Sequence, residues 1–307
     1  LLSRGLGDVY KRQSLGKATY ENLTLDEERA LYGLHHAEVR NCTFAGPADG
    51  ESALKECSEL LVSDCDFELR YPFWHVRSTE LHNCRMTDTC RAALWYDSNI
   101  RIQDSVLGGI KALRECEDVC LVRCKIQSPE FGWFCRKTML ESCTLESEYP
   151  FFECRNLEMK DLKLKGKYSF QYVEDAVIRN SYLDTKDAFW HSKNVTVVDS
   201  VVKGEYLAWY SENLRLVRCR IIGTQPLCYA RGLVLEDCEM EGTDLSFENS
   251  EVDATVRGEI LSVKNPVHGR IAADRIGEVI LDENLRPGAD CQILCRQTEL
   301  CSQAVLT

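Results

Sequence analysis

The sequence has few prolines, a deficit of basic charge and no long apolar run. Its 307 residues include only 7 prolines. The composition, with 44% hydrophobic and 28% charged residues, is that of a globular protein. The formal net charge is −12, and no Lys/Arg run occurs. A general nucleic-acid binder needs a basic face to displace counterions from phosphates, so nucleic acid is excluded as a partner. No apolar run approaches the ~20 residues of a membrane span, which argues against a membrane protein.

The N-terminus lacks the charged, apolar and small-residue regions of a signal peptide. Its first thirteen residues, LLSRGLGDVYKRQ, fit no later pattern and resemble a translated sequencing adapter. We therefore expect residues 1–13 to be non-native and leave them out of the fold. We predict a cytoplasmic location from the cysteine usage described next.

The seventeen cysteines do not have the spacing of a metal site or a disulfide scaffold. Most of them recur in two positions of a repeat, the first being Cys42, Cys65, Cys84, Cys124, Cys143, Cys219 and Cys238, and the second Cys57, Cys116, Cys135 and Cys154. Elsewhere the first position holds Ser105, Leu162, Ser181 or Ser200, so it selects small residues that can be buried. We predict reduced thiols packed as small hydrophobes in a reducing compartment, with no metal and no cofactor. Neighbouring coils are close enough for a disulfide, which therefore stays as an alternative.

A period of nineteen residues organises the chain. Successive occupants of the first small-residue position are separated by 19, 23, 19 and 21 residues and then by seven intervals of 19, starting from Leu23 and ending at Cys238. A fixed period of this length is the signature of a solenoid. Two insertions, AGPADGES (45–52) and MTDTCRAA (86–93), explain the two longer intervals.

Within each repeat the apolar residues alternate, as in VTVVDSVV (195–202). Alternation of Val, Ile and Leu between turn residues indicates short strands, whereas the leucines and asparagine of leucine-rich repeats are missing. The prediction is an all-β parallel β-helix of about twelve coils over 14–281. Past Asp253 the register fades, but three strand-like segments remain. Residues 282–307 are expected to form a C-terminal cap or tail.

Ten residues before each small-residue position, an aromatic or charged side chain recurs. If equivalent positions stack, these residues and their neighbours form one partly exposed face, because a buried ladder would not admit unpaired Lys or Arg. Aromatic rings beside carboxylates suit sugar rings, planar ligands or cations. The predicted ligand-binding residues are Trp74, His75, Arg91, Trp95, Tyr96, Lys111, Arg114, Trp133, Tyr172, Trp190, Trp209 and Tyr210. Aromatic stacking that only stabilises the rod is the alternative.

The sequence contains no nucleophile motif, phosphate loop or metal-ligand spacing. The catalytic candidates are Glu115 and Glu130, as paired carboxylates on successive coils, and Asp187 with His191, as an oriented base. Each of these residues also fits an ordinary surface ion pair or polar network. Whether the protein is an enzyme stays open.

Ten segments in order resemble an uncharacterised bacterial family, the domain of unknown function 3737. They include GPADGESALKE (46–56), LRYPFWH (69–75), CRAALWY (90–96), DTKDAFWHSKNV (184–195) and KGEYLAWYSENL (203–214), and the match runs from about 18 to 296. The resemblance implies a right-handed parallel β-helix of the pectate-lyase-like kind, and it brings no activity or catalytic residues.

Two functions remain open from the sequence. The first is a protein that binds, and in one version modifies, a carbohydrate or another small molecule on the aromatic face. The second is a non-catalytic scaffold whose aromatic face contacts a protein partner or stabilises the rod. The sequence does not indicate an oligomeric state.

Overall fold

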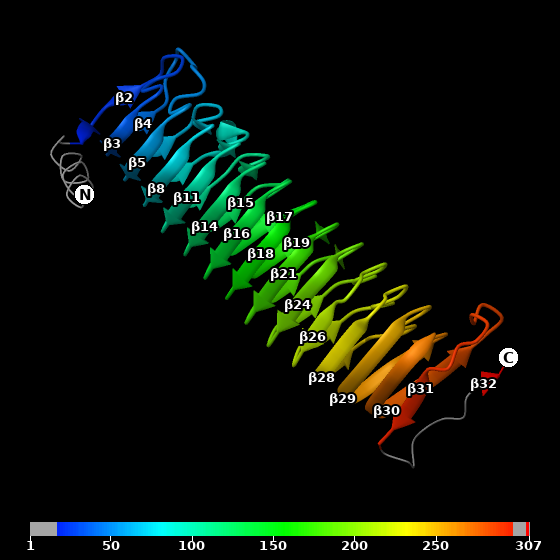
Figure 1. The fold of residues 1–307 in the computed structure, drawn as a ribbon. Coiled ribbons are helices and arrows are strands. Elements are labelled where there is room, and N and C mark those ends of the chain that lie inside the picture. The colour runs from blue at the N-terminus through cyan, green and yellow to red at the C-terminus, as the bar shows by residue number, and fades with distance from the viewer. Residues whose placement is uncertain (1–16, 297–304, 307) are drawn as a thin grey trace, which may run out of the picture.

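The protein is an elongated parallel β-solenoid (Figure 1). The structure, a computed structural model, describes residues 17–296 and 305–306. About 15 coils follow one another along the rod. Twelve of them are the predicted repeats. The remaining coils are formed by residues 251–295, where two of the predicted strand-like segments, 269–276 and 277–283, belong to a single strand. In the described part of the chain, no helix is long and apolar enough to cross a membrane.

One face of the rod is a parallel sheet of long strands. Each strand pairs with its equivalent one coil away, as Val195 does with Ala176, because an inter-coil ladder is the way in which short strands satisfy their backbone groups. The long strands are β1 (Ala18–Glu21), β3 (His35–Arg40), β5 (Ser58–Ser63), β8 (Arg77–His82), β11 (Ser98–Gln103), β14 (Glu117–Val122), β16 (Arg136–Glu141), β18 (Arg155–Lys160), β21 (Glu174–Arg179), β24 (Lys193–Val198) and β26 (Arg215–Val217).

A second face is built from short strands that follow the long ones. They are β2 (Thr24–Leu25), β4 (Thr43–Phe44), β6 (Asp66–Phe67), β9 (Arg85–Met86), β12 (Val106–Leu107), β15 (Lys125–Gln127), β17 (Thr144–Ser147), β19 (Lys163–Gly166), β22 (Tyr182–Asp184), β25 (Val201–Lys203) and β27 (Arg220–Ile222). The third side is less regular. Its strands are β7 (Phe73–Trp74), β10 (Leu94–Trp95), β13 (Leu113–Arg114), β20 (Tyr168–Ser169) and β23 (Asp187–Ala188), and the 3₁₀ helix η2 (Asp88–Cys90) lies in the second insertion.

The corner between the long and short strands explains why Cys or Ser recurs at the small-residue position of the repeat. The residue before that position has a left-handed backbone, as at Asn180 (φ 49°) and Asp199 (φ 49°), a conformation that Asn and Asp tolerate best. This kink interrupts the ladder, and the next N–H takes a side-chain partner. The Ser181 N–H donates to Ser200 Oγ at 3.0 Å, and Ser200 Oγ donates to the Val198 carbonyl at 2.7 Å.

Thiols fill the same role in other coils. The Cys124 N–H donates to Cys143 Sγ at 3.4 Å. Fifteen of the described cysteines, Cys295 not counted, are free, as predicted for packed thiols. Burial raises the pKa of Cys57 to about 11 and that of Cys90 and Cys228 to about 12, so these thiols stay protonated at neutral pH.

The core between the faces is apolar and stacked in register. Phe151, Phe170 and Phe189 are fully buried, and their ring centroids are 5.0 and 5.1 Å apart in successive coils. Such repetition lets each coil contact mainly its two neighbours. Every coil therefore presents its outward side chains at a fixed position relative to those of the next coil.

Toward the C-terminus the corners straighten. Strands β28 (Leu233–Glu241), β29 (Glu251–Lys264) and β30 (His268–Leu281) each run across both faces. In the segment expected to form a cap, β31 (Gln292–Cys295) and β32 (Val305–Leu306) pair with β30. The adapter-like residues 1–13 lie outside the described residues.

Candidate functional site

The five predicted tryptophans form an inner aromatic column, consisting of Trp74, Trp95, Trp133, Trp190 and Trp209. All five are half-buried. Trp74 and Trp95 stack with centroids 5.3 Å apart and ring planes at 10°, and Trp190 stacks on Trp209 at 5.7 Å and 5°. Lys55 Nζ lies 3.9 Å from the centroid of Trp74. Because neighbouring groups occupy the ring faces, this column directs mainly ring edges toward solvent.

The next position of the repeat forms an outer aromatic column, consisting of His75, Tyr96, Tyr172, His191 and Tyr210; Tyr172 follows Gln171, and the others follow tryptophans. The described side chains stack again: His191 lies 5.1 Å from Tyr172 and 5.0 Å from Tyr210, and His75 lies 5.2 Å from Tyr96. Three of the rings, those of Tyr96, Tyr172 and Tyr210, are 43–47% exposed. The structure therefore brings the predicted aromatic residues together as two ladders, partly exposed but without a deep cleft.

The indole N–H groups divide the inner column into two parts. In the later coils each N–H donates to a carbonyl sixteen residues ahead, from Trp133 to Tyr149 at 2.7 Å, from Trp190 to Tyr206 at 2.9 Å and from Trp209 to Gln225 at 2.8 Å. The Nε1 atoms of Trp74 and Trp95 are buried and have no hydrogen-bond partner among the described residues. These two tryptophans flank the second insertion.

The predicted charged residues pair with one another. Lys111 Nζ lies 3.4 Å from Glu130 Oε2, and Arg114 Nε lies 2.9 Å from Glu115 Oε1. A hydrogen bond with Glu115 also raises the pKa of Tyr96. Glu115 and Glu130 thus belong to different ion pairs, and no hydrogen bond or ion pair joins the two residues within the described chain.

Asp187 and His191 are placed in different environments. Asp187 is 6% exposed, and desolvation by burial raises its pKa. Its Oδ1 atom is buried and has no hydrogen-bond partner in the described structure. The His191 ring is exposed and stacked between two tyrosines. No hydrogen bond or ion pair connects these two described residues.

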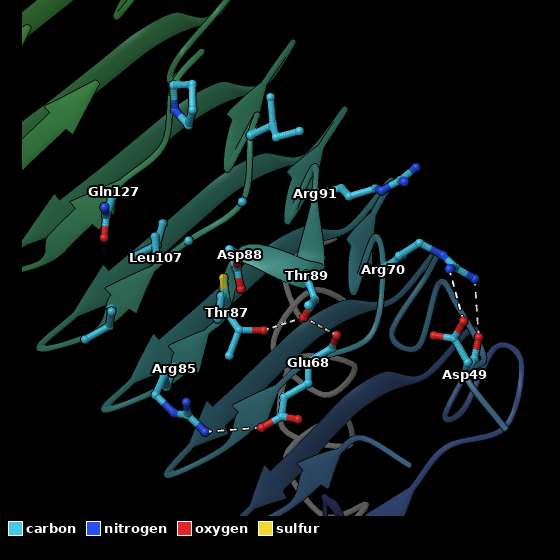
Figure 2. A pocket seen from close by; sticks show the side chains of 16 residues that line it. Asp49, Glu68, Arg70, Arg85, Thr87, Asp88, Thr89, Arg91, Leu107 and Gln127 are labelled. Atoms are coloured by element: carbon cyan, nitrogen blue, oxygen red, sulfur yellow. Dashed lines mark hydrogen bonds and ion pairs between the residues drawn. The ribbon is translucent and has the colours of Figure 1, made fainter. Parts of the chain in front are cut away.

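A large hollow of the described surface is lined by no residue of the two aromatic columns. It has a volume of about 880 Å³, and the second insertion, with Thr87, Asp88, Thr89 and Arg91, forms one wall (Figure 2). Asp49 from the first insertion and Arg70 lie at its rim. Arg91 is thus the one predicted ligand-binding residue that lines this hollow. Insertions in a solenoid commonly build the binding face.

A polar network fixes the wall. Thr87 Oγ1 and Thr89 Oγ1 are 2.6 Å apart, and Thr89 Oγ1 donates to the Glu68 carbonyl at 2.5 Å (Figure 2). Below the wall, a Cβ on Gly109 would lie 2.6 Å from the Arg91 carbonyl oxygen. Only glycine therefore lets this coil pass so close beneath the insertion.

The hollow continues along the short-strand face as a groove. Two further hollows of about 590 and 430 Å³ share lining residues with it, Val106 and Gln127 in one case, and Gln127 and Pro129 in the other. We call this surface the short-strand groove; it is bounded by the insertions at one end and by Tyr182 and Asp184 at the other. Its base consists of outward residues of β9, β12, β15, β17, β19 and β22.

Most charges in the groove are neutralised. Arg70 lies 3.1 Å from Asp49, Arg85 lies 3.4 Å from Glu68, Lys165 lies 3.2 Å from Glu146, Lys167 lies 2.7 Å from Glu148 and Lys203 lies 3.2 Å from Asp184. Three cations of the groove, Arg91, Lys125 and Lys163, have no ion pair within the described chain. The groove acid without one is Asp88.

Sequence reasoning missed every groove residue except Arg91. The sequence did contain a signal for the groove, namely the two intervals that exceed nineteen residues. Such an insertion forms a wall beside an otherwise flat face. The outward residues Lys125, Gln127, Thr144 and Lys163 carried no separate signal, since outward polar residues occur on every strand. Among the described residues no group of three or more His, Cys, Asp or Glu side chains could hold a metal ion.

These features define a β-solenoid with an open lateral groove. The family model for a protein of unknown function, DUF3737, matches residues 18–294. The chain therefore belongs to the DUF3737 family, in agreement with the resemblance seen in the sequence. No curated protein matches the chain.

Several solved structures are distantly similar. The surface adhesin PfbA of Streptococcus pneumoniae has 11% identity and a TM-score of 0.38, covering 75% of this chain and 73% of that chain. The A-module of the mannuronan C-5 epimerase AlgE6 of Azotobacter vinelandii has 8% identity and a TM-score of 0.35, covering 94% and 89%. A mutant tailspike of the E. coli bacteriophage HK620, in complex with a hexasaccharide, has 9% identity and a TM-score of 0.28, covering 94% and 61%. At sequence identities and TM-scores this low, neither the ligands nor the activities of these proteins can be assigned to this chain.

Proposed function

We propose that the protein binds an extended saccharide chain along the short-strand groove. The observation that carries this proposal is the continuity of the groove: three hollows share residues over successive coils, from Arg85 on β9 to Asp184 on β22. A linear polymer can follow a groove that repeats the same side-chain positions in every coil, whereas a compact metabolite would need a closed pocket.

The groove lining also suits sugar hydroxyls. Thr144, Gln127 and the wall residues Thr87 and Thr89 supply hydroxyl and amide groups that both donate and accept hydrogen bonds. The exposed side chains of Val106, Ile110 and Tyr182 also line the hollows and offer apolar surface for the C–H faces of a sugar ring. The aromatic columns contribute ring edges, so we place the primary contact in the groove and keep the columns as a secondary surface.

Filling the groove tests the proposal. Thr144 is an exposed groove residue on β17, and Thr144→Trp would place an indole across the path of the ligand. A matched control is Thr196→Trp, on the long-strand face at β24. Binding is measured on an array of linear acidic and neutral oligosaccharides and then by titration calorimetry. We expect the wild type and the control to bind alike and the Thr144 variant to lose affinity about tenfold or more, since an anchored clash removes several contacts at once.

The proposal fails if the wild type binds no saccharide on the array, or if Thr144→Trp binds as well as Thr196→Trp. A scaffold function for the exposed outer aromatic column would then be the better explanation. Retained binding that is lost on Trp190→Ala, but not on Thr144→Trp, would move the site to the aromatic columns.

We also propose that the protein works in a reducing compartment, as a cytoplasmic protein would. Fifteen of the described cysteines, Cys295 not counted, are free, and most of them are buried. Thiols of such number persist as thiols where glutathione and thioredoxin keep them reduced. Thiol titration of the denatured protein, isolated without reductant, should detect all 17 cysteines; a clear deficit would show that disulfides form and would overturn the proposal.

A further inference from the structure

The short-strand groove differs in charge from the rest of the chain. The lining residues of the three hollows include seven cations, Arg70, Arg85, Arg91, Lys125, Lys163, Lys165 and Lys167, and six acids, Asp49, Glu68, Asp88, Glu146, Glu148 and Asp184. Seven minus six gives a local excess of one positive charge, in a protein whose net charge is −12. The groove is therefore a cationic strip on an acidic rod.

The excess resides in cations that no carboxylate neutralises. Five of the six acids lie within 4.0 Å of a cation, each paired with a Lys or Arg that it faces. Arg91, Lys125 and Lys163 have no such partner in the described structure. Arg91 is exposed on the insertion wall, and the two lysines are exposed on β15 and β19. An unpaired cation in an open groove is available to a ligand without first breaking an ion pair.

The register places the two lysines on alternate coils. Lys125 is aligned with Thr144, and Thr144 is aligned with Lys163. Since adjacent strands lie ~4.8 Å apart, their Cα atoms are separated by ~9.6 Å along the rod. One pyranose ring in an extended 1,4-linked chain advances by nearly one coil. Neighbouring rings turn their C6 groups to opposite sides, so groups on one side recur at every second ring.

We propose that the groove selects an acidic polysaccharide, whose carboxylates on alternate sugar rings contact Lys125 and Lys163 while Arg91 binds a further carboxylate at the insertion end. This inference rests on the proposed saccharide-binding function and adds the charge class of the ligand. The hydroxyl and amide groups of the groove bind the sugar ring, and the three cations distinguish an acidic chain from a neutral one. Attraction between exposed charges weakens as salt is added, so the selectivity depends on ionic strength.

The test uses matched hexasaccharides that differ only at C6. One pair is β-1,4-linked hexaglucuronate and cellohexaose, and the other is α-1,4-linked hexagalacturonate and its neutral galactose counterpart. Binding is measured by titration calorimetry with the full chain, Lys125→Gln/Lys163→Gln and the control Lys137→Gln, whose side chain lies on the long-strand face at β16. All three substitutions are at exposed positions, and thermal unfolding verifies that the variants fold.

The acidic member of at least one pair should bind more tightly than its neutral counterpart, and the preference should shrink between low and physiological salt. Each lysine removed should weaken acidic binding about two- to fivefold, as expected for exposed charge pairs, and leave neutral binding and the control unchanged. Equal binding of acidic and neutral chains, or an unaltered double variant, would overturn the charge selectivity and leave saccharide binding intact. No binding of any chain would overturn both.

Discussion

Two regions of the rod are built on the same repeat, but only one of them keeps the length of the repeat constant. The regular coils, over residues 124–238, keep a spacing of nineteen residues, and their tryptophans donate to the carbonyls of the next coil. The insertion coils, over residues 43–115, lengthen the same turn twice, and the indole N–H groups of Trp74 and Trp95 have no partner among the described residues. The hollow of about 880 Å³ lies beside the insertion coils.

This difference shows that the insertions add local relief to an otherwise uniform rod. The regular repeat gives each of its indole N–H groups a carbonyl partner one coil away, and it produces a uniform surface. An insertion breaks that rule, leaves some groups unsatisfied and creates a wall that the regular coils lack. The insertion coils should therefore respond differently from the regular coils when equivalent positions are changed.

The largest effect is expected at the close contact beneath the insertion. Gly109 has φ 105°, and a Cβ there would lie 2.6 Å from the Arg91 carbonyl oxygen. Gly109→Ala should lower the free energy of unfolding by about 3 kcal/mol, combining backbone strain with overpacking. In the control Gly242→Ala, φ is 63° and no atom lies within 4 Å, so strain alone should cost about 1 kcal/mol. Denaturant unfolding of both variants gives the comparison, and equal losses would show that the contact is not tight.

A buried carboxyl group provides the second comparison. Asp97 is 1% exposed and occupies the position held by Cys116 and Ser192 in later coils. Its Oδ1 accepts from the Val76 N–H at 2.7 Å, and its Oδ2 is buried without a described partner. Desolvation raises the pKa of Asp97 well above its usual range, so the group stays protonated in the folded protein.

Replacing this group should stabilise the protein at neutral pH. Above the ordinary pKa of Asp, only the unfolded chain ionises at this position, so the free energy of unfolding falls as pH rises. Asp97→Cys keeps an acceptor for Val76 and removes the unsatisfied oxygen, which should add about 2 kcal/mol at pH 7. The gain should shrink toward about pH 4, where the unfolded carboxyl is also protonated. A gain that does not vary with pH would contradict the protonated state.

The smallest effect concerns the two kinds of tryptophan. Trp209→Phe leaves the Gln225 carbonyl without its 2.8 Å hydrogen bond, whereas Trp95→Phe removes an N–H that has no described partner. Both changes remove a similar stacked area, so the difference isolates the hydrogen bond. Trp209→Phe should reduce stability by about 1 kcal/mol more than Trp95→Phe, as measured by urea unfolding. The reverse order would indicate that the indole of Trp95 has a partner in solution.

The sequence was sufficient to predict the fold because each coil repeats the same pattern of buried and outward residues. The positions of Cys84, Ser105 and Cys124 were predicted to be buried from spacing alone, and the structure confirms all three. The left-handed kink before them explains their chemistry, which period counting cannot reveal. The predicted count of coils was lower than the observed one because β29 and β30 cross the corner as continuous strands, and β31 lies in the segment that was expected to be a cap.

The groove could not be predicted in the same way, because it depends on which neighbours face each other. Lys163 and Lys165 are two residues apart on β19, yet Lys165 is paired with Glu146 and Lys163 has no ion pair in the described chain. The period of nineteen residues aligns Lys165 with Glu146 and Lys163 with Thr144, but it does not show that this face of the rod is hollowed. The aromatic residues, in contrast, were visible in the sequence, but their stacking geometry was not. Their role as ligand contacts stays a prediction.

The column of small buried residues has a consequence for how the protein is lost. While the chain is folded, burial keeps thiols such as Cys57 and Cys228 protonated and out of reach of oxidants. Unfolding would release them together into solvent, where their pKa returns to the ordinary range and thiolates form. In air the opened chains would then cross-link faster than they refold. Heat inactivation without reductant should therefore be a one-way event, governed by the rate of opening rather than by an equilibrium.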